Sequence, residues 1–134
     1  MQRLWALTHA LEVRSKSMAR TLGVTGPQRL VIRIIGQMPN ASARDVSDTL
    51  GMHPSTLTGI LARLEAQKMI VRTKDSEDRR VARLQLTRGG EAIDRERKGT
   101  VEAAVRRAMG RADPPVLANA MTMLELLTAE LERD

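Results

Sequence analysis

The apolar positions in the N-terminal part of the chain recur at helical spacing. The first stripe consists of Leu4, Leu7, Leu11, Met18 and Leu22. It predicts one long amphipathic helix over residues 2 to 22, which Gly23 ends. The second stripe consists of Leu30, Val31, Ile34, Ile35 and Met38. Because Thr25 and Gln28 form a capping-box pattern ahead of it, a second helix is expected to end near Met38.

Two shorter helices are expected next, with a tight turn between them. Ser42 followed by Asp45 repeats the capping pattern, and Gly51 ends a helix of about two turns. Pro54 suits the first position of the following helix, which extends to about Gln67. The residues expected to face inward are Val46 and Leu50 in the first of these helices and Leu57, Ile60, Leu61 and Leu64 in the second.

From Met69 the apolar period changes from 3.6 to 2. The segments MIVRTK and VARLQL alternate apolar with polar residues around the polar segment DSEDRR, which predicts a β-hairpin with a charged tip. Thr87 is expected to cap one helix over residues 88–109, and Asp113 the last helix. The fold class predicted is mainly α with a small β-hairpin wing, in the element order of a winged helix-turn-helix.

The helix that begins at Pro54 is the candidate recognition helix. In a winged helix-turn-helix this helix enters the major groove, and its N-terminal residues reach base edges. The candidate contacts are Ser55, Thr56, Thr58, Gly59 and Arg63. Gly59 would permit close approach to DNA or to a neighbouring helix. The alternative is that these are ordinary surface residues of a structural helix.

The hairpin supplies a second set of candidate contacts. Arg79 and Arg80 lie at its tip, and Arg72, Lys74 and Arg83 lie along its strands. A guanidinium group is favoured in a narrow minor groove by the negative potential there. In one interpretation, the acids Asp75, Glu77 and Asp78 only neutralise these cations in a solvated turn. In the favoured one, Asp78 pairs with Arg80 and leaves Arg79 free for DNA.

Charge and composition narrow the partner. The net charge is +6, and residues 1–90 carry 15 basic against 7 acidic side chains, so an anionic partner is expected. Because Phe and Tyr are absent, the base-stacking platforms typical of single-strand binders are missing, and duplex DNA is favoured.

Catalytic and metal chemistry is not expected. The chain has no cysteine, and its two histidines, His9 and His53, are 44 positions apart in the sequence, so no metal site and no cofactor are predicted. The acidic clusters near residues 91–96 and 125–132 are interpreted as surface ion pairs. No membrane span or signal peptide is predicted, and a cytoplasmic location is expected.

Taken together, the segments LGVTGPQ and ARDVSDTLGMHPSTLTGILARLEAQKMIVRTKDSEDRRVARLQLTRGGEAI resemble the MarR (multiple antibiotic resistance regulator) family. Its most specific feature here is the D-x-R wing, Asp78 to Arg80, followed by Leu86 and Thr87. The resemblance implies a homodimeric repressor or activator with a small-molecule pocket near the junction with the DNA-binding lobes. His53 and Gly59 depart from it, because many members carry Asp and Arg at these positions.

The resemblance also implies a division of labour within a single MarR-like domain over residues 1–134. Residues 24–90 would form the DNA-binding lobe, and residues 1–23 and 91–134 the dimerisation helices. The near-heptad stripe Leu117, Met121, Leu124, Leu127 and Leu131 agrees with such an interface. An intramolecular helical bundle is the alternative. A two-fold dimer would bind a pseudo-palindromic operator.

The first helix also suggests a candidate effector pocket. Arg14 and Ser15 interrupt the apolar stripe of the first helix. Arg14 either pairs with an acid at an interface or lies beside Met18, Ile34 and Met38, where a small carboxylate or phenolate would fit. The function predicted is a sequence-specific duplex-DNA-binding repressor released by a small, anionic aromatic ligand. The alternative is a winged-helix module that binds an acidic protein.

Overall fold

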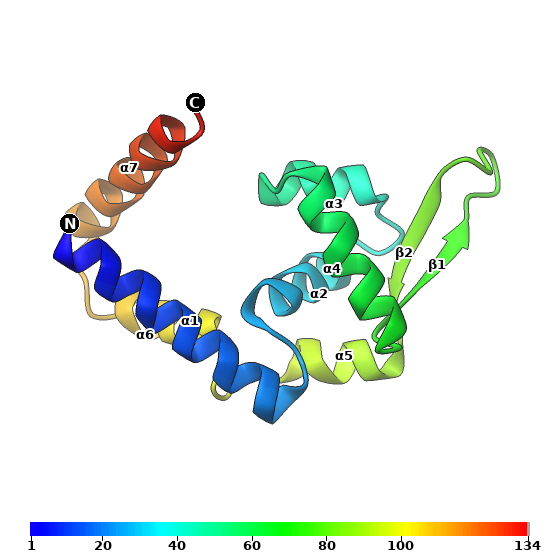
Figure 1. Ribbon diagram of the computed structural model, residues 1–134, viewed down its shortest axis with the longest axis horizontal. Helices are drawn as coiled ribbons and strands as arrows, with labels where there is room; N and C mark the ends of the chain where they lie inside the picture. Colours follow the sequence, from blue (N-terminus) through cyan, green and yellow to red (C-terminus); the bar gives the residue numbers. More distant parts are fainter. Residues whose placement is uncertain (134) are drawn as a thin grey trace. The chain divides into compact units, whose positions relative to one another are not determined.

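The structure, a computed structural model that describes residues 1–133, is built from helices and one antiparallel hairpin (Figure 1). The elements are α1 (Gln2–Leu22), α2 (Gly26–Gln37), α3 (Ala43–Leu50), α4 (Pro54–Ala66), β1 (Ile70–Lys74), β2 (Ala82–Leu86), α5 (Arg88–Arg95), α6 (Val101–Met109) and α7 (Pro114–Leu131). They form two compact units, one over residues 1–101 and one from Glu102 onward. The predicted fold class, mainly α with a small hairpin, is confirmed.

The core of the first unit lies between α2, α3, α4 and the hairpin. Its buried apolar residues are Val24, Val31, Ile32, Ile35, Ala41, Val46, Leu57, Ile60, Leu61, Leu64, Ile70 and Leu84. The predicted inner face of α4 is therefore confirmed. Leu30, expected on the inner stripe of α2, is instead 39% exposed. The neighbouring Arg29 is buried instead. Because successive helical residues point about 100° apart, Arg29 and Leu30 do not both face the core.

Both predicted capping boxes are present and fix where α2 and α3 begin. The Thr25 hydroxyl accepts from the Gln28 amide at 3.3 Å, and the Gln28 side chain accepts from the Thr25 amide at 2.9 Å. At α3 the reciprocal bonds between Ser42 and Asp45 measure 3.2 and 2.8 Å. Gly51 ends α3 in the left-handed region at φ 58°, a conformation that favours glycine. The turn into α4 is closed by Ser47, whose hydroxyl donates to the Met52 carbonyl at 2.6 Å and whose carbonyl accepts the Met52 amide at 3.1 Å.

The hairpin is anchored at its base by the segment between α2 and α3. Its register pairs Ile70 with Leu86 and Lys74 with Ala82. The Leu84 amide donates to the Ala41 carbonyl at 2.9 Å, and Leu84 accepts from the Asn40 amide at 3.2 Å. Residues 40–42 thus add a short bridge to β2 that the alternation pattern did not predict. This bridge ties the hairpin to the start of α3.

The prediction of one helix over residues 88–109 is wrong. The helix stops after Arg95, Glu96 is extended at ψ 132°, and Gly99 is left-handed at φ 75° before α6 begins. The Glu96 carboxylate accepts from the amides of Arg97 and Lys98 at 2.9 and 2.8 Å. Those bonds lower the pKa of Glu96. The polar segment between α5 and α6 therefore caps itself instead of continuing as a helix.

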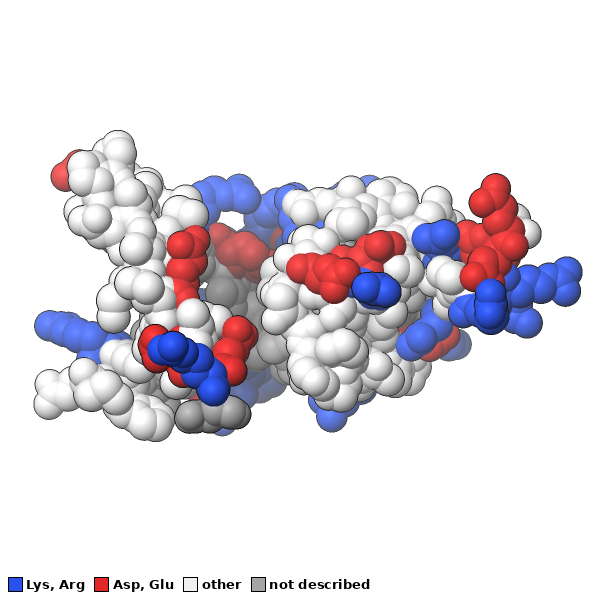
Figure 2. Space-filling view, turned by 90° about the horizontal axis from the view of Figure 1, so that it is seen from above, with Lys and Arg blue, Asp and Glu red and all other residues white. Residues whose placement is uncertain are grey.

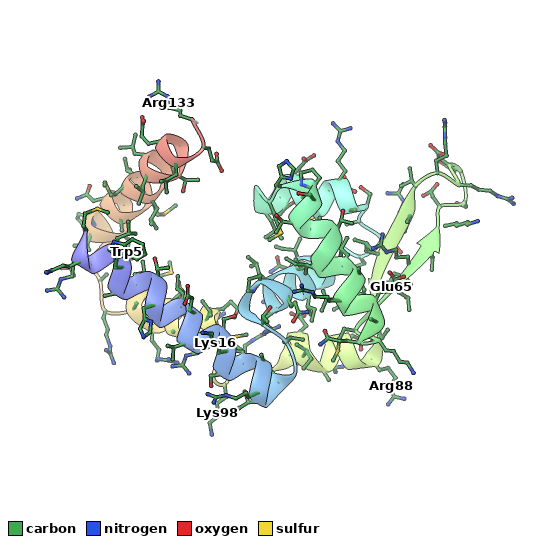
Figure 3. All side chains as sticks on the ribbon, viewed as in Figure 1. Trp5, Lys16, Glu65, Arg88, Lys98 and Arg133 are labelled. Carbon is green, nitrogen blue, oxygen red and sulfur yellow. The ribbon has the colours of Figure 1, made fainter. Side chains whose placement is uncertain are left out.

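Large apolar side chains remain exposed on α1 and on α7. On α1 these are Trp5, Leu7, Leu11 and Val13. On α7 they are Val116, Met121, Met123, Leu124, Leu126 and Leu131. Trp5 lies near the start of α1 (Figure 3). Within residues 1–133, no helix combines the length and apolar character needed to cross a bilayer.

Candidate nucleic-acid interface

His53 caps the N-terminus of α4. Its Nδ1 accepts the Ser55 backbone N–H at 3.2 Å and lies 2.7 Å from the Ser55 hydroxyl oxygen. Pro54 occupies the first turn, where its missing N–H leaves no donor unsatisfied. The residue that departs from the family pattern is thus part of the local structure that starts the candidate recognition helix.

The predicted contact residues of α4 lie on its solvent-facing side. Ser55, Thr56, Thr58, Gly59 and Arg63 are all exposed. The Thr58 hydroxyl donates to the Pro54 carbonyl at 2.8 Å. A Cβ built on Gly59 would meet nothing within 4 Å. Of the two explanations for Gly59, close approach to a helix of this chain is therefore not supported by the described residues.

The carboxylate of Asp75, which the sequence analysis treated only as one of three loop acids, organises the hairpin loop. Asp75 accepts from the amides of Glu77 and Asp78 at 2.8 and 2.9 Å, and from the Arg83 guanidinium at 2.6 Å. The Asp78 amide, then Arg83 and the Glu77 amide, lower the pKa of Asp75 to about 2. The signal that could have identified it is an Asp at the start of a polar loop, where its carboxylate can accept from amides two and three positions on, as in an Asx-type turn.

The expected pairing of Asp78 with Arg80 is present. Asp78 Oδ1 accepts from the Arg80 amide at 3.0 Å and from its Nε at 3.3 Å. Arg79, by contrast, is exposed and makes no side-chain hydrogen bond or ion pair within residues 1–133. Figure 2 shows basic side chains projecting beside acidic ones at the end of the molecule that carries the hairpin. The loop thus presents one tethered and one free guanidinium.

The strand cations have different surroundings. Arg72 donates to Glu65 on α4 at 3.0 Å, and Glu65 lies beside the hairpin in Figure 3. Arg83 is held by Asp75, and the pKa of Arg83 is raised mainly by that bond. Lys74 is exposed at the loop end of β1. Arg72 and Arg83 therefore brace the hairpin against α4 and the loop, while Lys74 stays available.

The candidate effector residues do not share one environment. Arg14 is exposed on α1, Met18 is buried, and Ile34 and Met38 are half-buried against the core. Ser15, which also interrupts the apolar stripe, accepts the Gly26 amide at 2.8 Å and so joins α1 to the start of α2. A separate cavity of about 530 Å³ lies between α2, β2 and α5, lined in part by Gly36, Leu86 and Asp94.

A buried arginine links α2 to the break after α5. Arg29 is 1% exposed and donates to the carbonyl oxygens of Asp94 at 3.1 Å and Glu96 at 2.6 Å. Asp94 Oδ1 lies 3.4 Å from Arg29 and 3.1 Å from Arg33. The interpretation of the acids near residues 91–96 as surface ion pairs is therefore wrong for Asp94, whose partner Arg29 is buried. The sequence did not indicate this pair because the two residues are 65 positions apart. Within residues 1–133, no group of three or more His, Cys, Asp or Glu residues is arranged to hold a metal ion.

The sequence of this chain is similar to those of known transcription regulators. A family model described as MarR family matches residues 22–81. The HTH-type transcriptional regulator FarR of Neisseria gonorrhoeae is 29% identical over 127 residues, which cover 92% of this chain and 82% of FarR. The HTH-type transcriptional repressor Rv2887 of Mycobacterium tuberculosis is 26% identical over 109 residues, covering 81% of this chain and 78% of the repressor.

Solved structures share the fold over nearly the whole chain. FabT of Streptococcus pneumoniae in complex with DNA has a TM-score of 0.72 and 26% identity, covering 98% of this chain and 94% of FabT. Rv2887 in complex with salicylic acid has a TM-score of 0.58 and 24% identity, with 92% of each chain covered. The fold of helices and hairpin is therefore shared with proteins solved in complex with DNA and with salicylic acid.

Proposed function

This chain belongs to the MarR family of transcription regulators, and from that premise we propose that it binds a specific duplex operator and represses transcription from it. The observation that carries the proposal is the exposed first turn of α4 beside a hairpin whose tip holds a free arginine. The curated relatives are transcription regulators, which supports a non-enzymatic role. We also propose that the protein acts in the cytoplasm.

The proposed contacts divide between base edges and the DNA backbone. Ser55, Thr56 and Thr58, with Gly59 allowing close approach, would face bases in the major groove. Arg63, Lys74, Arg79 and Arg80 would contact phosphate or the minor groove. We assign Arg72 to the same surface at its edge, since its guanidinium also braces β1 against Glu65.

The proposed organisation is a homodimer in which the whole chain acts as one functional domain. Residues 24–90 would bind DNA, and residues 1–23 and 91–134 would join the two copies. The exposed apolar residues of α1 and α7 support this assignment, because a monomer rarely leaves so many large apolar side chains in water. Two-fold symmetry would place the two α4 helices about 34 Å apart, matched to a pseudo-palindrome.

A small anionic aromatic compound is proposed to release the operator. Support comes from the salicylic acid complex of Rv2887 and from a cation, Arg14, on the helix that also carries Met18. The ligand must bind the DNA-competent and incompetent states with different affinity. Salicylate is expected to weaken the protein–duplex complex, with neutral benzamide as the matched control. An unchanged salicylate effect in Arg14→Ala would remove Arg14 from the pocket.

Selection of bound fragments from random duplex DNA tests the proposal. The expected result is enrichment of a pseudo-palindrome whose two halves are about one helical turn apart. Duplex binding without an enriched sequence would contradict an operator-specific regulator. Absence of duplex binding together with capture of an acidic protein would favour the interaction module.

A further inference from the structure

The histidine cap determines how the Ser55 hydroxyl can bond. Because His53 Nδ1 accepts the Ser55 backbone N–H at 3.2 Å, it carries no proton, and a neutral ring then holds its proton on Nε2. The Ser55 hydroxyl lies 2.7 Å from the same Nδ1, so in this contact the hydroxyl is the donor. The two donors thus share the single lone pair of Nδ1. The hydroxyl hydrogen of Ser55 is thus used inside the protein, while its oxygen lone pairs face solvent.

The hydroxyl of Thr58, on the same face of α4, also donates its hydrogen within the protein. Thr58 lies three positions after Ser55, so the two side chains are neighbours on one side of α4. Thr58 donates its hydroxyl hydrogen to the Pro54 carbonyl at 2.8 Å, which also leaves only its lone pairs for a partner. Thr56 makes no such bond within residues 1–133. Two of the three exposed hydroxyls at this end of the helix are therefore acceptors only.

We propose that Ser55 and Thr58 recognise exocyclic amino groups of bases, adenine N6 or cytosine N4, in the major groove. The inference rests on the proposed function, in which this turn of α4 meets base edges. Phosphate oxygens, guanine O6 and N7 and thymine O4 are all acceptors, whereas only adenine and cytosine offer a donor in this groove. An acceptor-only hydroxyl is complementary to those amino groups. It can bind phosphate, guanine or thymine only after giving up its internal bond.

His53 is therefore a specificity-determining residue that acts through Ser55. Aspartate or asparagine at this position would also supply an acceptor for the Ser55 hydrogens, but alanine would not. In His53→Ala the Ser55 hydroxyl regains a free hydrogen and can donate as well as accept. The preference at the base pair read by Ser55 should then weaken, because a hydroxyl that donates as well as accepts can also bond the acceptors that guanine and thymine present. His53→Asn is the matched control, because its side-chain oxygen keeps both the cap and the acceptor.

The first experiment assigns the contacts by selection from random duplex with wild type, Ser55→Ala and Thr58→Ala. The position that loses its preference in each variant identifies the base read by that residue. We expect each alanine variant to lose its preference at one base pair, in which the amino group of adenine or cytosine, on either strand, is the group read. Because every base pair contains adenine or cytosine, the selection locates the contacted pairs, and the altered duplexes below decide whether the amino group is contacted. Unchanged preferences in both alanine variants would overturn the inference while leaving the proposed function intact. A failure to select any sequence would instead count against the proposed function.

The second experiment uses wild-type protein and a chemically altered operator. Where adenine is selected, it is replaced by purine, which lacks the N6 amino group but keeps the ring. Where cytosine is selected, 2-pyrimidinone replaces it. Loss of the amino group should weaken wild-type binding about fivefold, the size of one net hydrogen bond. It should cost the corresponding alanine variant nothing further. Equal losses for wild type and variant would show that the hydroxyl does not contact the amino group, and would overturn the proposal.

The His53 variants are compared on the same duplexes. The expected result is a widened base preference for His53→Ala and an unchanged one for His53→Asn, with both folded by circular dichroism. The preference of each variant is a ratio of affinities for two duplexes, so a general loss of stability does not mimic it. An unchanged preference in His53→Ala would show that the cap does not set the bonding of Ser55.

Discussion

At the scale of single residues, charged side chains hold the irregular segments of the first unit in place. Asp75 gathers two amides and a guanidinium to shape the hairpin loop. Arg29 gathers two carbonyls to fix the end of α5. In each case one charged group satisfies several backbone groups that would otherwise lack partners in an irregular segment. Replacing these residues should therefore affect structure before it affects DNA contact.

Arg29→Met should destabilise the fold. The change retains apolar volume but leaves the carbonyls of Asp94 and Glu96, and the Asp94 carboxylate, without this donor. Breaking such a buried charged cluster costs about 2 to 4 kcal/mol. Urea unfolding followed by circular dichroism measures the loss. Arg95→Ala, which breaks only exposed bonds to the Glu91 carboxylate and carbonyl, is the control and should cost less than about 1 kcal/mol. Equal stability of the two variants would contradict the structural role of Arg29.

The hairpin loop should keep its structure well into acid. The pKa of Asp75 is lowered to about 2, so its contribution is fully present above the ordinary aspartate pKa of about 4. It is lost as the pH falls through about 2. The amide resonances of Glu77 and Asp78, which donate to Asp75, should report this transition by NMR. Asp75→Asn should shift both resonances at neutral pH. A midpoint near 4 in wild type would contradict the bonds described.

At the scale of elements, the accuracy of sequence prediction depends on how local the determinants are. The two capping boxes, the buried face of α4 and the hairpin were predicted because each is encoded within a few neighbouring residues. The break between α5 and α6 was not, since it depends partly on Arg29, which lies more than 60 positions away. The candidate base contacts were found from the order of elements. The bonding states of Ser55 and Thr58 required atomic positions.

Gly99→Ala tests the helix break. Gly99 holds a φ of 75°, where an alanine Cβ costs about 1 kcal/mol. We expect a loss of stability of this size in urea unfolding. Gly59→Ala, in the helical part of α4 with open space around it, should instead gain about 1 kcal/mol. A stabilising Gly99→Ala would indicate that residues 96–100 continue as helix in solution.

At the scale of the whole molecule, the uneven distribution of charge and apolar surface matches two tasks. Residues 1–90 carry the excess of basic side chains, and α1 and α7 carry the exposed apolar ones. A dimer would cover the apolar surface of α1 and α7 and would present two copies of the basic surface. Assembly and operator binding are therefore expected to depend on each other.

Leu124→Asp should disrupt both dimer assembly and operator binding. Leu124 is 55% exposed on α7, and a carboxylate placed in an apolar interface lacks a partner. Light scattering at micromolar concentration should show a dimer for wild type and a monomer for the variant, with operator affinity falling in parallel. Glu130→Gln, an exposed change on the same helix, should leave both unchanged. A monodisperse wild-type monomer that still binds the operator would contradict the proposed dimer.

The central claim, that the hairpin and α4 contact duplex DNA, is tested most directly by the salt dependence of binding. Each phosphate contact contributes about 0.9 to the slope of log K against log salt concentration. Changing Arg79 and Arg80 together to Ala should weaken specific and non-specific duplexes alike and reduce that slope by about 1 to 2, while Arg95→Ala should leave it unchanged. An arginine double variant with wild-type affinity and slope would contradict the account.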